Sequence, residues 1–182
     1  MEKLTAIIED AVRIFDTEGF RAVGIDRLLG PSGVSTRTFY KYFGSRDGLV
    51  IAVLEARHRG FMAQLEANAL DADSVGGLFD TLRLWMEERG ARGCMLLRAR
   101  SEYAEANQEI VALVHRQKCE FRDEVAKRVL KDLGRDDAQL CSQVWLLFEG
   151  ATAAAGVAGV SLVDDAKEAA LMLLATARAH SL

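Results

Sequence analysis

The sequence predicts an all-α protein of about nine helices. The chain of 182 residues is half hydrophobic, which is enough to bury a sizeable core, and its single proline, Pro31, leaves long helices with few interruptions. Apolar residues recur at helical spacing along most of the chain, and no segment shows a convincing strand pattern. These observations favour a helical fold throughout.

The helices can be placed by their apolar spacing and by the residues that begin and end them. Gly19 can end the first helix as a C-terminal glycine. Ser35 can cap a helix that ends at Phe43, because its hydroxyl can accept from a free amide of the first turn, and Ser45 can cap the next helix in the same way. The helices are expected at residues 3–18, from 25 to the turn at 30–33, and at about 35–43, 45–68, 74–89, 94–104, 107–133, 137–159 and 163–180.

The composition argues against several classes of protein. No apolar run reaches the roughly 18 residues that span a bilayer, and acidic residues interrupt the apolar start of the chain, so we expect a cytoplasmic protein without a membrane partner. Cys94, Cys119 and Cys141 are widely spaced and are expected to be buried thiols. The three histidines lack the spacing of a metal site, and no nucleophile or phosphate-loop motif occurs, so we expect no cofactor, no metal and no catalysis.

Positive charge is concentrated in one short stretch of an acidic chain. The net charge is −4. Residues 20–47 contain five Lys or Arg against two Asp, whereas residues 1–19 contain two basic residues against five acidic ones. A local positive region of this kind is expected where an acidic protein contacts nucleic acid.

Residues 25–49 carry the most informative pattern. A short helix, a tight glycine-containing turn and a second short helix follow one another, and Phe39 and Phe43, four residues apart, should face inward. An ordinary helix pair with a solvated polar face explains each residue singly but not the joint pattern. The second helix suits the major groove of DNA, and its other positions carry hydroxyls, rings and cations that bind phosphates or bases: Thr36, Arg37, Tyr40 and Lys41, with Thr38 and Tyr42 at the flanks and Arg46 at the start of the next helix.

The stretch GVSTRTFYKYFGSRDGL, residues 33–49, resembles the TetR family of transcription regulators, and residues 4–68 match the N-terminal domain of that family in order and spacing. The resemblance implies a recognition helix at about residues 36–42, whose residues divide by role. It implies contacts to bases or nearby phosphates for Thr36, Arg37 and Lys41, and contacts to the DNA backbone for Thr38, Tyr40, Tyr42 and Arg46.

The chain departs from the family pattern around the second helix. A Thr or Ser usually caps this helix and touches a phosphate, whereas Gly24 offers no side-chain oxygen, which leaves Arg27 as the candidate replacement. Pro31 lies inside the usual span of the helix and therefore predicts an early or kinked end.

The resemblance also implies two domains. Residues 1–48 would form a helix-turn-helix DNA-binding domain, with the boundary inside the 46–68 helix, and residues 49–182 would form a helical domain that binds a small-molecule effector and forms a homodimer. The effector is expected to be partly apolar. Candidates for its pocket are apolar residues for which plain core packing is the competing interpretation: Phe61, Met62, Leu65, Trp85, Met95, Phe121 and Trp145.

The dimer prediction depends on a run of small residues at 150–159. Small side chains let helix backbones approach closely, and the family implies an interface of four helices built from the last two long helices of each chain. A helix buried at the centre of one chain is the alternative. The candidate interface residues are Trp145, Phe148, Thr152 and Gly156.

The predicted function is a ligand-responsive DNA-binding transcription regulator. We expect a repressor that binds a palindromic operator in double-stranded DNA as a homodimer. Two alternatives belong to other classes: a helical protein-interaction module without specific DNA binding, and an all-α cofactor-binding bundle.

Overall fold

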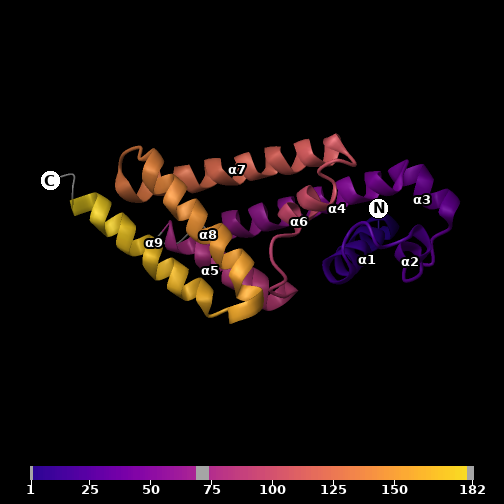
Figure 1. Cartoon of the computed structure of the whole chain (residues 1–182), viewed down its shortest axis with the longest axis horizontal. Coiled ribbons are helices and arrows are strands. Elements are labelled where there is room, and N and C mark those ends of the chain that lie inside the picture. The colour runs from indigo at the N-terminus through magenta and orange to yellow at the C-terminus, as the bar shows by residue number, and fades with distance from the viewer. Residues whose placement is uncertain (1, 69–73, 180–182) are drawn as a thin grey trace. The chain divides into compact units, whose positions relative to one another are not determined.

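The computed structural model describes residues 2–68 and 74–179, and every regular element within these ranges is a helix (Figure 1). The all-α prediction is confirmed. The described helices are α1 (Glu2–Glu18), α2 (Ile25–Leu29), α3 (Thr36–Phe43), α4 (Arg46–Ala67), α5 (Gly76–Arg89), α6 (Met95–Glu102), α7 (Gln108–Leu133), α8 (Ala138–Ala158) and α9 (Leu162–Ala179).

Local signals set the ends of the first helices as the sequence predicts. Gly19 follows α1 with φ +79°, a conformation that favours glycine. The Ser35 hydroxyl accepts from the amide of Thr38 at 3.3 Å, and the Ser45 hydroxyl accepts from the amide of Gly48 at 2.9 Å. Helix α2 ends before Pro31, so the early end that this proline predicts is confirmed.

The chain forms two compact units. Unit 1 comprises the residues up to Gly60 together with Met95–Gln117, and unit 2 comprises Phe61–Cys94 and the residues from Lys118 onward. Helices α4 and α7 each contribute residues to both units. The three N-terminal helices therefore share a compact body with α6 and the start of α7, which follow them only after a long stretch of chain.

Unit 1 has a continuous hydrophobic core. Phe15, Phe20 and Phe39 are fully buried, and Phe15 and Phe20 stack with ring centroids 4.9 Å apart. Residues of α6, including Met95 and Ala99, are part of the same core. Burial of such side chains is the main favourable term in folding, so α6 is an integral part of this unit.

Unit 2 packs α5, the second half of α7, α8 and α9 around a cluster of aromatic rings. Phe61, Phe121 and Phe148 meet with centroid distances of 4.5–6.0 Å. Arg128 is buried and donates to the carbonyls of Leu65 and Ser74 at 2.8 and 3.1 Å, so its donors are paired inside the unit.

The three cysteines are less buried than the sequence predicts. Cys119 is exposed on α7, and Cys94 and Cys141 are only partly buried, so the expectation of three buried thiols was wrong.

Within the described residues, α8 has the length and composition that could cross a membrane. That helix packs against α5 and α9 within unit 2.

Asp137 caps α8, and its titration gives the fold a defined response to acid. Its carboxylate accepts from the amide of Leu140 at 2.9 Å, and this hydrogen bond, aided by Arg135, lowers the pKa of the Asp137 carboxyl below its ordinary value. The folded chain then binds fewer protons at this site than the unfolded chain. The stability that the carboxylate contributes is therefore present above the unfolded pKa and is lost as pH falls through the folded pKa.

We predict that Asp137→Ala lowers the melting temperature at neutral pH and that this loss shrinks in acid. The difference from wild type should be full above about pH 5 and should decline as the carboxylate is protonated. The Asp137→Asn variant keeps an uncharged acceptor, so its melting temperature should exceed that of Asp137→Ala by the same margin at every pH. Thermal unfolding followed by circular dichroism measures both, and a wild-type advantage over Asp137→Ala that is independent of pH would contradict the assignment.

Candidate nucleic-acid interface

Helix α3 is mounted on unit 1 by one face. Ser35 at its N-cap has extended backbone angles and caps the first turn. Phe39 is fully buried and Phe43 is half-buried, with ring centroids 5.3 Å apart. The inward orientation predicted for Phe39 is confirmed, and Phe43 packs at the edge of the core. The helix is thereby held by its inner face and leaves its outer face open.

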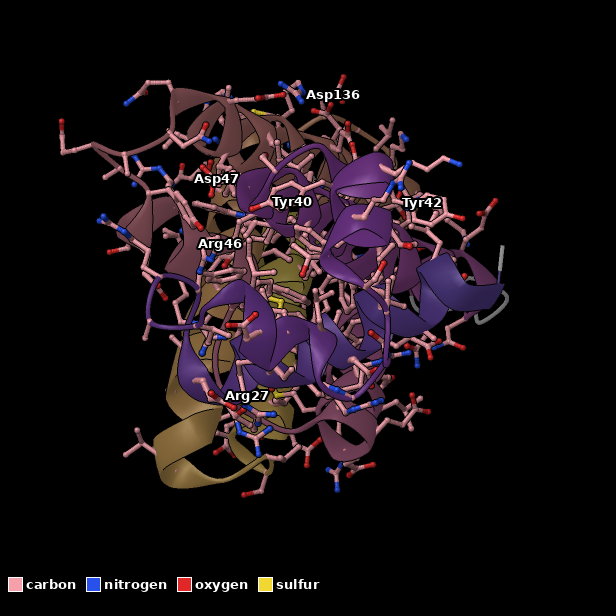
Figure 2. All side chains as sticks on the ribbon, turned by 90° about the vertical axis from the view of Figure 1, so that its right-hand side faces the viewer. Arg27, Tyr40, Tyr42, Arg46, Asp47 and Asp136 are labelled. Carbon is pink, nitrogen blue, oxygen red and sulfur yellow. The ribbon has the colours of Figure 1, made fainter. Side chains whose placement is uncertain are left out.

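The outer face of α3 carries five of the residues predicted to contact DNA. Tyr40 and Tyr42 are 45% and 52% exposed, and both project from α3 on the face shown in Figure 2. Thr36, Arg37 and Lys41 are exposed as well. Hydroxyl groups and cations on a free helix face are the groups that bind phosphates and base edges.

Thr38 takes part in the cap of α3. Its hydroxyl lies 3.0 Å from that of Ser35, and the residue is half-buried. Thr38 therefore lies beside the outer face, with one hydrogen bond already made inside the helix end.

The corner between α3 and α4 requires glycine. Gly44 has φ +69° and follows the last residue of α3. A Cβ built on Gly48 would lie 2.0 Å from the carbonyl oxygen of Phe43, a distance that no side chain can occupy. Only glycine lets the first turn of α4 approach the end of α3 this closely, which fixes the direction of α3 relative to α4.

Arg27 lies on the exposed surface of α2 and pairs with Glu18. Its Nη2 and Nε donate to the Glu18 carboxylate at 2.6 and 3.1 Å. Ion pairs at such exposed positions contribute roughly 0–1 kcal/mol, so a phosphate can compete with Glu18 for this guanidinium. Figure 2 shows Arg27 on α2, away from Tyr40 and Tyr42.

Arg46 is directed into unit 1. Its Nε donates to the carbonyl of Val23 at 2.9 Å, its Nη1 donates to the Tyr103 hydroxyl at 2.8 Å, and its Nη2 donates to the carbonyl of Phe20. The structure therefore does not bring this guanidinium to the outer face of α3. The contact of Arg46 with the DNA backbone stays a prediction. In the structure, its hydrogen bonds hold the loop between α1 and α2.

Three residues of this support were missed at the sequence level. Arg98 donates to the carbonyls of Phe15 and Asp16 at 2.8 and 3.0 Å, where it complements the C-terminal end of α1. Glu102 accepts from two backbone amides of the loop that follows α1. Burial raises the pKa of the Tyr103 phenol, which stays neutral and accepts from Arg46. No local pattern points to these pairs, because their members lie 57–83 residues apart.

The residues predicted for an effector pocket fall into two groups. Met95 belongs to the core of unit 1. The others lie in unit 2, where most of them surround the aromatic cluster: Phe61, Met62, Leu65, Trp85, Phe121 and Trp145.

The residues predicted for the dimer interface lie mostly inside unit 2. Phe148 and Thr152 are buried, and the Thr152 hydroxyl donates to the Phe148 carbonyl within α8. Trp145 is half-buried, beneath the Arg122 guanidinium at 5.0 Å. A Cβ on Gly156 would lie 2.6 Å from the carbonyl oxygen of Ala91, so this glycine admits a close approach within the chain.

The described residues offer no alternative site of metal chemistry. Within residues 2–68 and 74–179, no group of three or more His, Cys, Asp or Glu side chains could hold a metal ion.

Comparison with known proteins agrees with this geometry. Residues 7–53 match the family model described as bacterial regulatory proteins, tetR family. No curated protein sequence matches the chain. The matched segment begins within α1 and ends within α4, and so includes the whole outer face of α3.

Solved structures resemble the chain over nearly its whole length. A TetR-family transcriptional regulator from Streptomyces coelicolor is 26% identical, with a TM-score of 0.89, and the match covers 98% of this chain and 91% of that one. TetR regulators from Chloroflexus aurantiacus and Haloarcula marismortui are 17% and 16% identical, both with TM-scores of 0.81; the matches cover 96% of this chain and 94% and 97% of theirs.

These last two likenesses support the fold alone, whereas the family model and the Streptomyces regulator add similarity in sequence. Residues 7–53, which include α3, are thus similar in sequence to the bacterial regulatory proteins of the tetR family, and the chain as a whole has the fold of TetR-family transcription regulators.

Proposed function

We propose that this protein is a cytoplasmic, non-catalytic repressor that binds a palindromic operator in duplex DNA as a homodimer and is controlled by a small-molecule effector. The observation that carries the proposal is the outer face of α3, where hydroxyls and cations stand exposed on a helix anchored by Phe39. A helix of this kind fits the major groove.

The DNA-binding body in this proposal is larger than residues 1–48. It includes the start of α4 and residues 95–117, because α6 and the start of α7 belong to the same compact unit as α1–α3. In the proposal, the effector and dimerisation functions belong to unit 2, which lies within residues 49–182.

Lys41→Ala should weaken binding to all duplexes by a similar factor. A lysine that neutralises one phosphate contributes to affinity without reading sequence, and its loss should lower the slope of log affinity against log salt by about 1. Fluorescence anisotropy with labelled duplexes at several salt concentrations measures both quantities. Lys131→Ala, which removes the same charge from the exposed end of α7, is the matched control and should leave the slope unchanged. Equal slopes for wild type and Lys41→Ala would contradict the role of α3.

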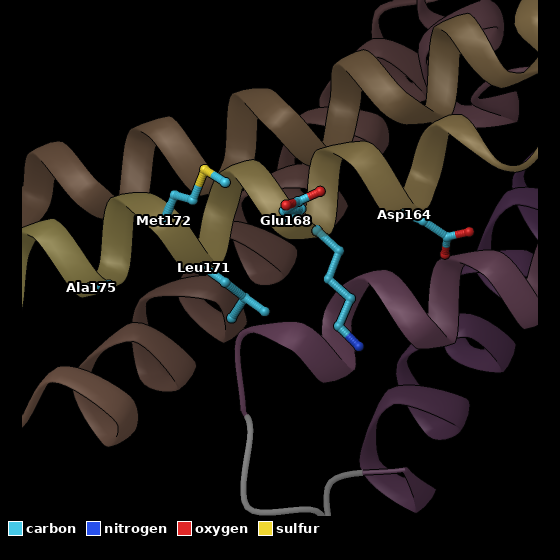
Figure 3. A pocket seen from close by; sticks show the side chains of 6 residues that line it. Asp164, Glu168, Leu171, Met172 and Ala175 are labelled. Carbon is cyan, nitrogen blue, oxygen red and sulfur yellow. The ribbon is translucent and has the colours of Figure 1, made fainter.

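The proposed dimer interface is the exposed stripe of α8 with the neighbouring surface of α9. Leu146 and Val157 on α8 are 61% and 93% exposed, and Met172 on α9 is 60% exposed. An open groove between the two helices is lined mainly by apolar and small side chains. Figure 3 shows Met172 and Leu171 along α9, beside Glu168 and Asp164.

A second copy of this chain suits that stripe because the stripe carries no charge on α8. Glu149, the one charged residue of α8, pairs with Lys118 instead of facing outward. In a two-fold contact the same surface meets itself, so the α8 part of this interface brings no like charges together. This interface uses Leu146, Gly150 and Val157, which are exposed, rather than Phe148 and Thr152, which are buried.

Leu146→Glu should convert the dimer to a monomer at micromolar concentrations, because it places a charge on each side of an apolar contact. Leu130→Glu changes an exposed leucine of α7 in the same way and should leave the dimer intact, which makes it the matched control. Light scattering coupled to size-exclusion chromatography reports the mass. A dimer that survives Leu146→Glu unchanged would rule out this face.

Two unpaired polar atoms on α8 support an effector site in unit 2. Trp145 Nε1 and Glu149 Oε2 are buried and have no hydrogen-bond partner, and they lie one helical turn apart. Buried polar groups normally find partners, so unpaired ones call for an explanation such as a ligand. An effector with an apolar body, one hydrogen-bond acceptor and one donor would satisfy both atoms beside the aromatic cluster.

If Lys118 and Glu149 serve to bind the effector, their ion pair should contribute little to the free energy of unfolding. Lys118→Met leaves the carboxylate of Glu149 without its charged partner and should cost about 3–5 kcal/mol. The double variant Lys118→Met with Glu149→Leu should unfold in urea at a concentration equal to or above that of wild type. A double variant as unstable as the single one would show that the pair is structural.

A further inference from the structure

Helix α2 begins without a side-chain cap. Gly24 occupies the N-cap with φ −80° and ψ 165°, and no side chain hydrogen-bonds to the first turn there. The helix has only five residues, and isolated helices shorter than about 12–15 residues are marginal in water. The placement of α2 therefore depends on contacts with the rest of unit 1.

The loop that precedes α2 is held by a carboxylate from α6. Glu102 Oε2 accepts from the amides of both Phe20 and Arg21 at 2.9 Å. The carboxylate also lies against Gly19, where a Cβ would be 3.4 Å from Oε1. Hydrogen bonds to an ionised acceptor are stronger than neutral ones, so this contact holds the loop before α2 firmly.

The opposite side of the same loop is held by α4. Arg46 donates to the carbonyls of Phe20 and Val23, so Phe20 has its amide bound by Glu102 and its carbonyl bound by Arg46. The hydroxyl of Tyr103, directly after Glu102 in the chain, accepts from the same guanidinium at 2.8 Å. The loop between α1 and α2 is thus fixed by tertiary hydrogen bonds rather than by a cap of its own.

We propose that Glu102 is a positioning residue for DNA binding, whose carboxylate fixes the loop before the uncapped α2 and thereby sets the position of α2 and α3. This role rests on the proposed function, in which unit 1 binds duplex DNA. It makes the position of α6 a determinant of DNA affinity, although Glu102 is distant in sequence from α3 and does not belong to its exposed face.

The first test compares Glu102→Ala and Glu102→Gln in the full-length chain. The probe is the tightest-binding duplex selected from a random library, and anisotropy is measured at a temperature where circular dichroism shows each variant folded. Glu102→Ala should weaken binding about tenfold. Glu102→Gln, which keeps an oxygen acceptor but no charge, should fall between Glu102→Ala and wild type. Equal affinity of wild type and Glu102→Ala would overturn the proposal.

The decisive test restores the missing cap. Apart from the two adjoining residues, no heavy atom lies within 4 Å of a Cβ built on Gly24, and its extended backbone suits a serine N-cap. Gly24→Ser should recover most of the affinity lost in Glu102→Ala while changing the wild-type chain little, and Gly24→Ala, which adds no oxygen, should recover none. If Gly24→Ser strengthened DNA binding by the same factor in the wild-type chain and in Glu102→Ala, the serine would be making an independent new contact, and the proposal would be overturned.

Hydrogen exchange separates this proposal from the proposed function. The amides of Phe20 and Arg21 should exchange faster in Glu102→Ala than in wild type, even without DNA. Unchanged exchange would overturn the contact itself. A wild-type chain that binds no duplex in the selection would instead overturn the proposed function, and with it the role in DNA binding, whatever the exchange result.

Discussion

The guanidinium of Arg46 is the group on which the arrangement of unit 1 depends most directly. It joins α4 to the carbonyls of Phe20 and Val23 and to the hydroxyl of Tyr103, and it lies 5.9 Å from the ring centroid of Phe15. A guanidinium presents its donors in a rigid planar fork, so it accepts only one arrangement of these acceptors. Because the group is mostly withdrawn from solvent, losing an acceptor would leave a charged donor unpaired.

This constraint matters because the helices that would meet DNA are short. Helices α2 and α3 have five and eight residues, and neither would be stable alone. Their positions come from buried Leu28 and Phe39 and from the close approach at Gly48. A recognition surface held in this way is ordered before it binds, so little conformational freedom remains to be lost on association.

The features that the sequence predicts well are those that depend on neighbours in the chain. The end of α1 at Gly19 and the caps by Ser35 and Ser45 follow from residue type and spacing, as does the inward face of α3. Arg46 shows where such reasoning stops. Its place at the start of α4 suggested a phosphate contact, but the loop that engages it precedes it by 23 to 26 residues, and no local pattern shows that the loop lies there.

Local sequence patterns also failed to show which face of α8 is buried inside unit 2 and which is exposed. Along α8 the apolar residues lie on every side, so periodicity could not distinguish the face that holds Phe148 from the face that holds Leu146. The structure buries Phe148 among the rings of unit 2 and leaves Leu146 and Val157 exposed. A helix that is apolar all round requires cover on both sides, and α5, α7 and α9 cover one of them. A second copy would cover the other with the same uncharged stripe, and it would bring a second α3, which is what a palindromic duplex requires of its reader.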